Sequence, residues 1–178
     1  RITASNYIIN EAERLEAISE KLLDEAFIRE NEIDVIPTNI KKLVLSTQQM
    51  FLNRINEKDI NLFINVDDDI IYCDPTLISV VLSNLVDNAI KACKNGGQIL
   101  IESRKTKEHF ILSIKDNGIG IPSEQIKHIT EPFYRTDKSR SRSEGGTGLG
   151  LSLCEKIIKA HKSNLNFESK VGVGTAAI

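Results

Sequence analysis

The chain has 178 residues, the length of one domain with room for a small appendage. Hydrophobic residues make up 40% and charged residues 27%, enough to build an ordinary globular core. The net charge of −2 gives no electrostatic reason to expect nucleic acid or an anionic membrane as a partner. No apolar run reaches the ~20 residues of a membrane-spanning helix. Cys73, Cys93 and Cys154 lack metal-ligand spacing and are predicted to be buried, reduced thiols.

Residues 4–29 are predicted to form one long amphipathic helix. Apolar residues recur every three or four positions between charged and amide side chains, and neither Gly nor Pro interrupts them. The apolar stripe consists of Ile8, Ala12, Leu15, Ile18, Leu22 and Ala26. The following residues lack a period and end on a proline, so we place a boundary between residues 1–36 and 37–178. The chain does not begin with Met, and we expect it to be a piece of a longer protein.

Helices and strands mix without strict alternation in the rest of the chain. Helices are predicted over residues 39–56, 74–95 and 148–161, with a short helix after residue 122. Strands are predicted over residues 60–66, 70–73, 98–105, 110–116, 165–169 and 175–178. This mixture predicts an α+β fold, an α/β sandwich in which helices cover one face of a mixed, mostly antiparallel sheet. The long amphipathic helix precedes it.

Four polar or glycine-rich blocks follow one another in the second half of the chain. They are NLVDNAIKA at 84–92, DNGIGIP at 116–122, EPFYR at 131–135 and GGTGLGL at 145–151, and GVGT at 172–175 closes the set. Each alone could be a turn or a helix end. Together they predict a nucleotide pocket, with a carboxylate for a base, an amide for a metal and bare backbone for phosphates.

Asp116 is the candidate for recognising the base. Adenine differs from guanine by an exocyclic amine, a donor that a carboxylate in a dry pocket accepts well. Asp116 ends an apolar strand, and Gly118 and Gly120 after it let the backbone approach the base edge. Asp-Asn-Gly alone is most often an ordinary turn. The following Ile-Gly-Ile-Pro and the preceding Asn88 favour the adenine role.

The block at residues 84–92 carries the candidate metal ligand. The amide oxygen of Asn88 suits Mg²⁺, which takes hard oxygen ligands and keeps phosphate oxygens and waters. Asn84 shares its helix face one turn earlier, and an amide cannot act as a base near pH 7. Lys91 can reach the same face toward a phosphate, although a solvated lysine remains an alternative.

GGTGLGL is predicted to open a helix, and a helix start binds anions through its free N–H groups and its dipole. Gly146, Gly148 and Gly150 permit close approach of the backbone, and Thr147 adds a hydroxyl. The basic loop at residues 136–144 is predicted to be a lid over the triphosphate. The candidate cations, among which the sequence does not choose, are Arg135, Lys138, Arg140 and Arg142.

From about residue 39 onward the blocks resemble the ATP-binding domain of bacterial sensor histidine kinases. NLVDNAIKA is similar to the N box of that family, DNGIGI to its G1 box, EPFYR to its F box and GGTGLGL to its G2 box. The domain has the Bergerat fold, shared with gyrase, heat-shock chaperone and mismatch-repair ATPases. The segment before Pro37 resembles the second helix of the dimerisation and histidine-phosphotransfer hairpin.

The resemblance implies a site for ATP and Mg²⁺. Asn88 is its metal ligand, and Asn84 and Lys91 are its catalytic residues. The implied nucleotide-binding residues are Asn84, Asn88, Lys91, Asp116, Gly118, Gly120, Ile121, Phe133, Tyr134, Arg135, Gly146, Thr147, Gly148, Leu149, Gly150, Leu151 and Thr175. In the ATP-hydrolysing relatives the position of Asn84 resembles that of a Glu that activates water. Because an amide cannot act as this base, the resemblance favours phosphoryl transfer over vigorous hydrolysis.

The implied activity is transfer of the γ-phosphate of ATP to a His on a helix missing from this chain. The implied partners are that phosphoacceptor helix, a response regulator receiver domain and a second copy of the full-length kinase, with no nucleic acid. The domain is expected in the cytoplasm, its parent anchored in the bacterial membrane. None of His109, His128 and His161 has the expected phosphoacceptor context. An anti-sigma-factor serine kinase and a binding-only pseudokinase of the same fold remain as alternatives.

Overall fold

A computed structural model describes residues 33–134 and 148–178. A compact unit spans Asp34–Ile178, and Arg1–Ile33 forms a separate one. The helix predicted over residues 4–29 and the predicted lid lie outside the described residues. The assignment of residues 1–36 to a phosphotransfer hairpin therefore stays a prediction.

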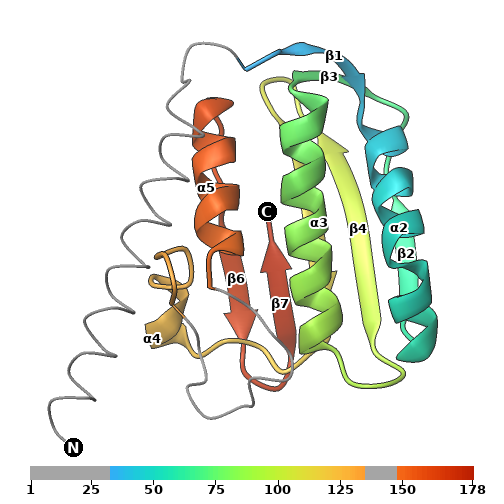
Figure 1. Ribbon diagram of the computed structural model, residues 1–178, viewed down its shortest axis with the longest axis vertical. Helices are drawn as coiled ribbons and strands as arrows, with labels where there is room; N and C mark the ends of the chain where they lie inside the picture. The colour runs from blue at the N-terminus through green and yellow to red at the C-terminus, as the bar shows by residue number, and fades with distance from the viewer. Residues whose placement is uncertain (1–32, 135–147) are drawn as a thin grey trace, which may run out of the picture. The chain divides into compact units, whose positions relative to one another are not determined.

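The larger unit combines three long helices with two sheets (Figure 1). Its elements in chain order are β1 (Ile36–Asn39), α2 (Ile40–Glu57), β2 (Asn61–Asn65), β3 (Ile70–Cys73), α3 (Pro75–Ala92), β4 (Gln98–Lys105), β5 (Phe110–Asp116), α4 (Ser123–Ile126), α5 (Gly150–Ala160), β6 (Phe167–Lys170) and β7 (Gly174–Ala177). Five strands form one sheet in the order β2-β4-β5-β7-β6. The β2–β4 pair is parallel and the other pairs are antiparallel. Because α2, α3 and α5 lie over one face, the expected α/β sandwich is confirmed.

Helix α3 is the central helix of this layer and packs against both α2 and α5. Asp74 begins it as expected: its Oδ1 accepts the N–H groups of Thr76 and Leu77 at 2.9 and 3.0 Å. The helix ends at Ala92, since Cys93 takes extended backbone. Within the described part of the chain, no helix combines the length and apolar character needed to cross a membrane.

The core lies between the helical layer and the sheet. Side chains alternate along a strand, so Ile99 and Ile101 of β4 point the same way and are at most 1% exposed. Ile90 of α3 and Ile157 of α5 are fully buried opposite the sheet. This packing orients the ends of the helices and strands, where the glycine-rich blocks lie.

Strand β1 was not predicted, because residues 31–37 show no alternation and contain a proline. It forms a separate two-stranded ribbon with β3, in which Ile36 is opposite Cys73 and Asn39 opposite Ile70. The pairing depends on a partner more than thirty residues away along the chain. A local pattern in the sequence carries no information about such a partner.

Candidate nucleotide-binding site

The blocks lie along the lower half of α3 in Figure 1: α5 begins beside the middle of α3, and the loop 116–122 lies at the end of α3. A Cβ added to Gly118 would lie 2.5 Å from the Ala92 carbonyl oxygen at the end of α3. A Cβ on Gly120, at φ +69°, would lie 2.1 Å from the Lys170 carbonyl oxygen before the β6–β7 turn. The loop 116–122 is thus held between α3 and that turn by contacts that only glycine allows.

The start of α5 contacts the other two blocks. A Cβ on Gly150 would lie 2.4 Å from Oδ1 of Asn84. A Cβ on Gly148, at φ +76°, would lie 2.7 Å from the backbone of Phe133, whose N–H donates to the Gly148 carbonyl oxygen at 3.0 Å. Gly148 and Gly150 therefore allow the GGTGLGL block to lie against both α3 and the EPFYR segment.

Asp116 lies at the end of β5 and is partly buried. Burial raises the pKa of its carboxyl above the ordinary value, although hydrogen bonds from the backbone N–H groups of Gly118 and Thr175 act in the opposite direction. The Gly118 bond, to Oδ1, is 2.8 Å long. Asn117 anchors the loop, because its Oδ1 accepts the Gln98 N–H at 2.8 Å. The arrangement presents an acceptor in a partly dry environment, as adenine recognition requires.

The side-chain amides of Asn88 and Asn84 differ in their hydrogen bonds to the rest of the protein. Asn88 is exposed, and its amide has no hydrogen-bond partner among the described residues. Its oxygen fits the ligand set of a hard cation. Asn84 donates from Nδ2 to the Val80 carbonyl oxygen at 2.9 Å, which leaves Oδ1 facing Gly150. Their roles in binding stay predictions.

Lys91 is engaged by a neighbour on its own helix. Its Nζ lies 2.7 Å from Oδ2 of Asp87, and Oδ1 of the same carboxylate pairs with Arg54 of α2. Burial opposes ionisation of Asp87, but the hydrogen bonds from Lys91 and Arg54 outweigh it and lower the pKa of its carboxyl. Asp87 and Arg54 were not among the predicted site residues, because in the sequence a half-buried charge on a helix cannot be told from a solvated one.

Ser169 of β6 is another contributor that sequence reasoning missed. Its Oγ accepts the Ile121 N–H at 2.8 Å and donates to the Gly174 carbonyl oxygen at 2.9 Å. The hydroxyl of Thr175 lies 2.8 Å from the same Oγ. Ser169 therefore ties the glycine loop to the last hairpin. A serine in a short alternating strand gives no signal of this role.

The remaining predicted residues are divided between the described and undescribed parts of the chain. The ring of Tyr134 lies 5.7 Å from that of His128, between centroids. Leu149 precedes α5 and Leu151 lies in its first turn, both half-buried. Arg135, Gly146 and Thr147 lie outside the described residues.

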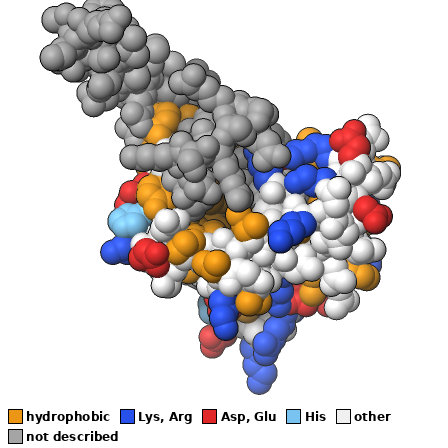
Figure 2. All heavy atoms as spheres, turned by 90° about the horizontal axis from the view of Figure 1, so that it is seen from below, with side chains coloured by type: hydrophobic (Ala, Val, Ile, Leu, Met, Phe, Trp, Pro, Cys, Tyr) orange, Lys and Arg blue, Asp and Glu red, His pale blue; other side chains and the backbone are white. Residues whose placement is uncertain are grey.

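The end of the molecule that holds these blocks carries mixed side chains. Figure 2 views this end from below and shows Lys and Arg side chains on it as well as apolar ones.

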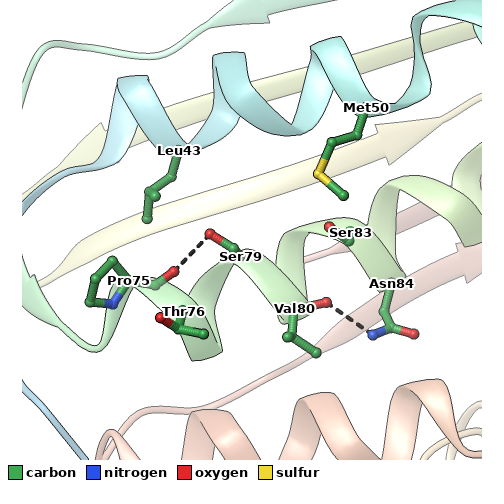
Figure 3. A pocket seen from close by; sticks show the side chains of 8 residues that line it. All are labelled: Leu43, Met50, Pro75, Thr76, Ser79, Val80, Ser83 and Asn84. Atoms are coloured by element: carbon green, nitrogen blue, oxygen red, sulfur yellow. Dashed lines mark hydrogen bonds between the residues drawn. The ribbon is translucent and has the colours of Figure 1, made fainter.

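A separate shallow groove of about 640 Å³ lies between α2 and α3 (Figure 3). Apart from Asn84, the residues lining it belong to none of the blocks.

Comparison with known proteins decides the family. The model of the family described as "Histidine kinase-, DNA gyrase B-, and HSP90-like ATPase" matches residues 73–178. The chain belongs to this family. The sensor histidine kinase YkoH of Bacillus subtilis is 35% identical over 170 residues, which are 95% of this chain and 37% of YkoH. The first curated relatives are longer, and the chain spans between 20% and 37% of their length.

Solved structures agree with this assignment. A structure of the catalytic domain of histidine kinase ThkA matches with a TM-score of 0.71 and 30% identity, over 82% of this chain and 93% of that one. Histidine kinase ThkA in complex with the response regulator protein TrrA matches with a TM-score of 0.70 and 29% identity, over 97% of this chain and 48% of that one. The described unit is therefore the ATP-binding domain of a two-component sensor kinase.

Proposed function

We propose that the protein of which this chain is part transfers the γ-phosphate of ATP to a histidine on a phosphoacceptor helix of the same kinase. The observation that carries the proposal is the contact of the blocks with α3. The loop after Asp116 contacts the end of α3 at Ala92, and the start of α5 contacts Asn84 of the same helix, both through glycines that leave no room for a side chain. A fold alone does not specify a reaction, whereas this set of groups matches the parts of a nucleotide.

Each block has a role in this proposal. Asp116 accepts a hydrogen bond from the adenine amine, and backbone N–H groups in the first turn of α5 bind phosphate oxygens. Asn88 holds Mg²⁺, since its exposed amide oxygen is unpaired among the described residues. When bound, the ion neutralises charge that develops on the transferred phosphoryl group.

Asn84 favours transfer over hydrolysis. Its Nδ2 is bonded to the Val80 carbonyl oxygen and its Oδ1 faces Gly150, so the side chain joins α3 to α5. A neutral amide has no basicity with which to activate water near pH 7. The site can therefore hold ATP while an acceptor histidine approaches.

The acceptor histidine is proposed to lie on another helix, because the three present here are poorly suited. His109 lies in the β4–β5 turn. Nδ1 of His128 pairs with Glu131 at 2.6 Å. Nε2 of His161 accepts the Asp74 N–H at 3.0 Å while Nδ1 contacts the Ile157 carbonyl oxygen at 2.8 Å, so both ring nitrogens are in use.

The remaining partners are proposals of the same kind. A response regulator receiver domain as phosphate recipient is supported by the ThkA structure, which was solved with TrrA. Dimerisation of the full-length parent, its anchoring in a membrane and a cytoplasmic position for this domain follow from the family resemblance. The curated relatives named sensor histidine kinases support them.

The test is labelling with γ-³²P-ATP. The 178-residue chain should bind ATP and remain unlabelled, while the parent protein with its phosphoacceptor hairpin becomes labelled. The label should be acid-labile and base-stable, as phosphohistidine is. Label on the isolated chain would mean that the acceptor is one of the three histidines here. Acid-stable label on a partner would favour a serine kinase, and ATP binding without any labelling of the parent would favour a pseudokinase.

A further inference from the structure

The carboxylate of Asp87 lies between two cations that come from different helices. Oδ1 pairs with Arg54 of α2 and Oδ2 with Lys91 of α3, the latter at 2.7 Å. The Arg54 guanidinium also lies 5.6 Å from the ring centroid of Phe51, one turn earlier on α2. Each oxygen of Asp87 thus has its own partner, and Arg54 is supported independently of Lys91.

The two helices are aligned so that this pairing lies beside the nucleotide site. Figure 3 shows Met50 of α2 above Ser83 and Asn84 of α3. Arg54 and Asp87 each follow four residues later, one helical turn farther along their helices. The pair therefore lies beside Asn88, the proposed metal ligand.

The ammonium of Lys91 can reach either Asp87 or a phosphate beside Asn88. Successive residues of a helix are separated by about 100°. Lys91 lies four residues after Asp87 and three after Asn88, so its stem projects from between those two faces. Its ammonium pairs with Asp87 in the structure. A phosphate beside Asn88 would compete with that carboxylate for the same ammonium.

We propose that Arg54 is a positioning residue of the nucleotide site, which compensates the charge of Asp87 when Lys91 leaves that carboxylate for a phosphate of ATP. The inference rests on the proposed function. Without Arg54, release of Lys91 would leave Asp87 unpaired in a half-buried position. Asp87 would then hold Lys91 more tightly and compete more strongly with the phosphate.

The test measures the affinity of the 178-residue chain for ATP and for AMP by titration calorimetry with Mg²⁺. Arg54→Gln should weaken ATP binding about fivefold, the scale of one ion pair near a protein surface, and should leave AMP unchanged. Asp87→Asn, which frees Lys91, should bind ATP at least as tightly as the wild type. The double variant Arg54→Gln/Asp87→Asn should return to within about twofold of the wild type. The matched control is Arg104→Gln, at the far end of β4, which should change neither affinity.

Three outcomes would contradict this role. In a Lys91→Gln background, Arg54→Gln should have no further effect; a persistent fivefold loss would show that Arg54 acts through its overall charge and would overturn the proposal. Equal losses for ATP and AMP, or no rescue by Asp87→Asn, would show a merely structural role and overturn it as well. A wild-type chain that binds no adenine nucleotide would instead overturn the proposed function and this inference with it. Urea unfolding of each variant checks that the comparisons are made between folded proteins.

Discussion

Replacement of Asp116 by Asn separates the recognition of adenine from the stability of the fold. The two side chains have nearly the same shape, and Oδ1 of the Asn can still accept the Gly118 N–H that Asp116 accepts at 2.8 Å. The other oxygen becomes an NH₂ group, which presents a donor where the adenine amine also presents a donor. We therefore expect the variant to lose one charge-assisted hydrogen bond to the ligand.

The size of the effect follows from that single bond. A hydrogen bond to a charged group contributes about 1.5–3 kcal/mol, and a loss of about 2 kcal/mol weakens ATP binding about thirtyfold.

The free energy of unfolding should not fall with the affinity. The folded pKa of Asp116 lies above the ordinary value of 3.8, so its contribution to stability is full below that value and is lost as the pH rises through the folded pKa. At neutral pH the ionised carboxylate therefore costs stability, which offsets a lost hydrogen bond from the Thr175 N–H, and the variant should be about as stable as the wild type.

Titration calorimetry with ATP and Mg²⁺ gives the affinity, and urea unfolding at pH 7 gives the stability. The matched control is Asp67→Asn, the same chemical change at an exposed position in the turn before β3, which should alter neither quantity. Unchanged ATP affinity in the Asp116 variant would refute the adenine assignment. Weaker binding together with a clear loss of stability would show that the carboxylate acts on the fold rather than on the base.

Three further predictions concern the fold. Gly174→Ala should destabilise the unit more than Gly172→Ala in urea unfolding, because a Cβ at Gly174 would lie 1.9 Å from the Asp116 carbonyl oxygen, whereas nothing lies within 4 Å at Gly172; equal losses would contradict the clash. Ile101→Ala should lower the free energy of unfolding by about 2–5 kcal/mol, since Ile101 is 1% exposed in the core, and a loss below about 1 kcal/mol would place it outside the core. Cys154 should resist iodoacetamide at pH 8 in the native protein and react after unfolding, because burial raises the pKa of its thiol to about 12; mass spectrometry of the labelled chain decides this, and rapid native labelling would contradict it.

The sequence alone predicted the main helices and the chemical character of the site. Apolar periodicity predicted α2 and α3, and Asp74–Pro75 predicted the start of α3, because helix signals depend on neighbours within a turn or two. The spacing of Asn84, Asn88 and the glycine blocks indicated a nucleotide pocket for a similar reason. Each block carries its chemistry within a few residues.

Only the tertiary structure decided which segments meet. Strand β1 pairs with β3 across the whole of α2, and Ser169 joins Ile121 to the last hairpin across nearly fifty residues. Arg54 reaches Asp87 only because α2 and α3 pack in parallel with Met50 above Ser83. Such contacts depend on the register between elements, which is set by the packing of the whole core. The sequence therefore indicated the chemical groups of the site, whereas the packing determined which residues position them.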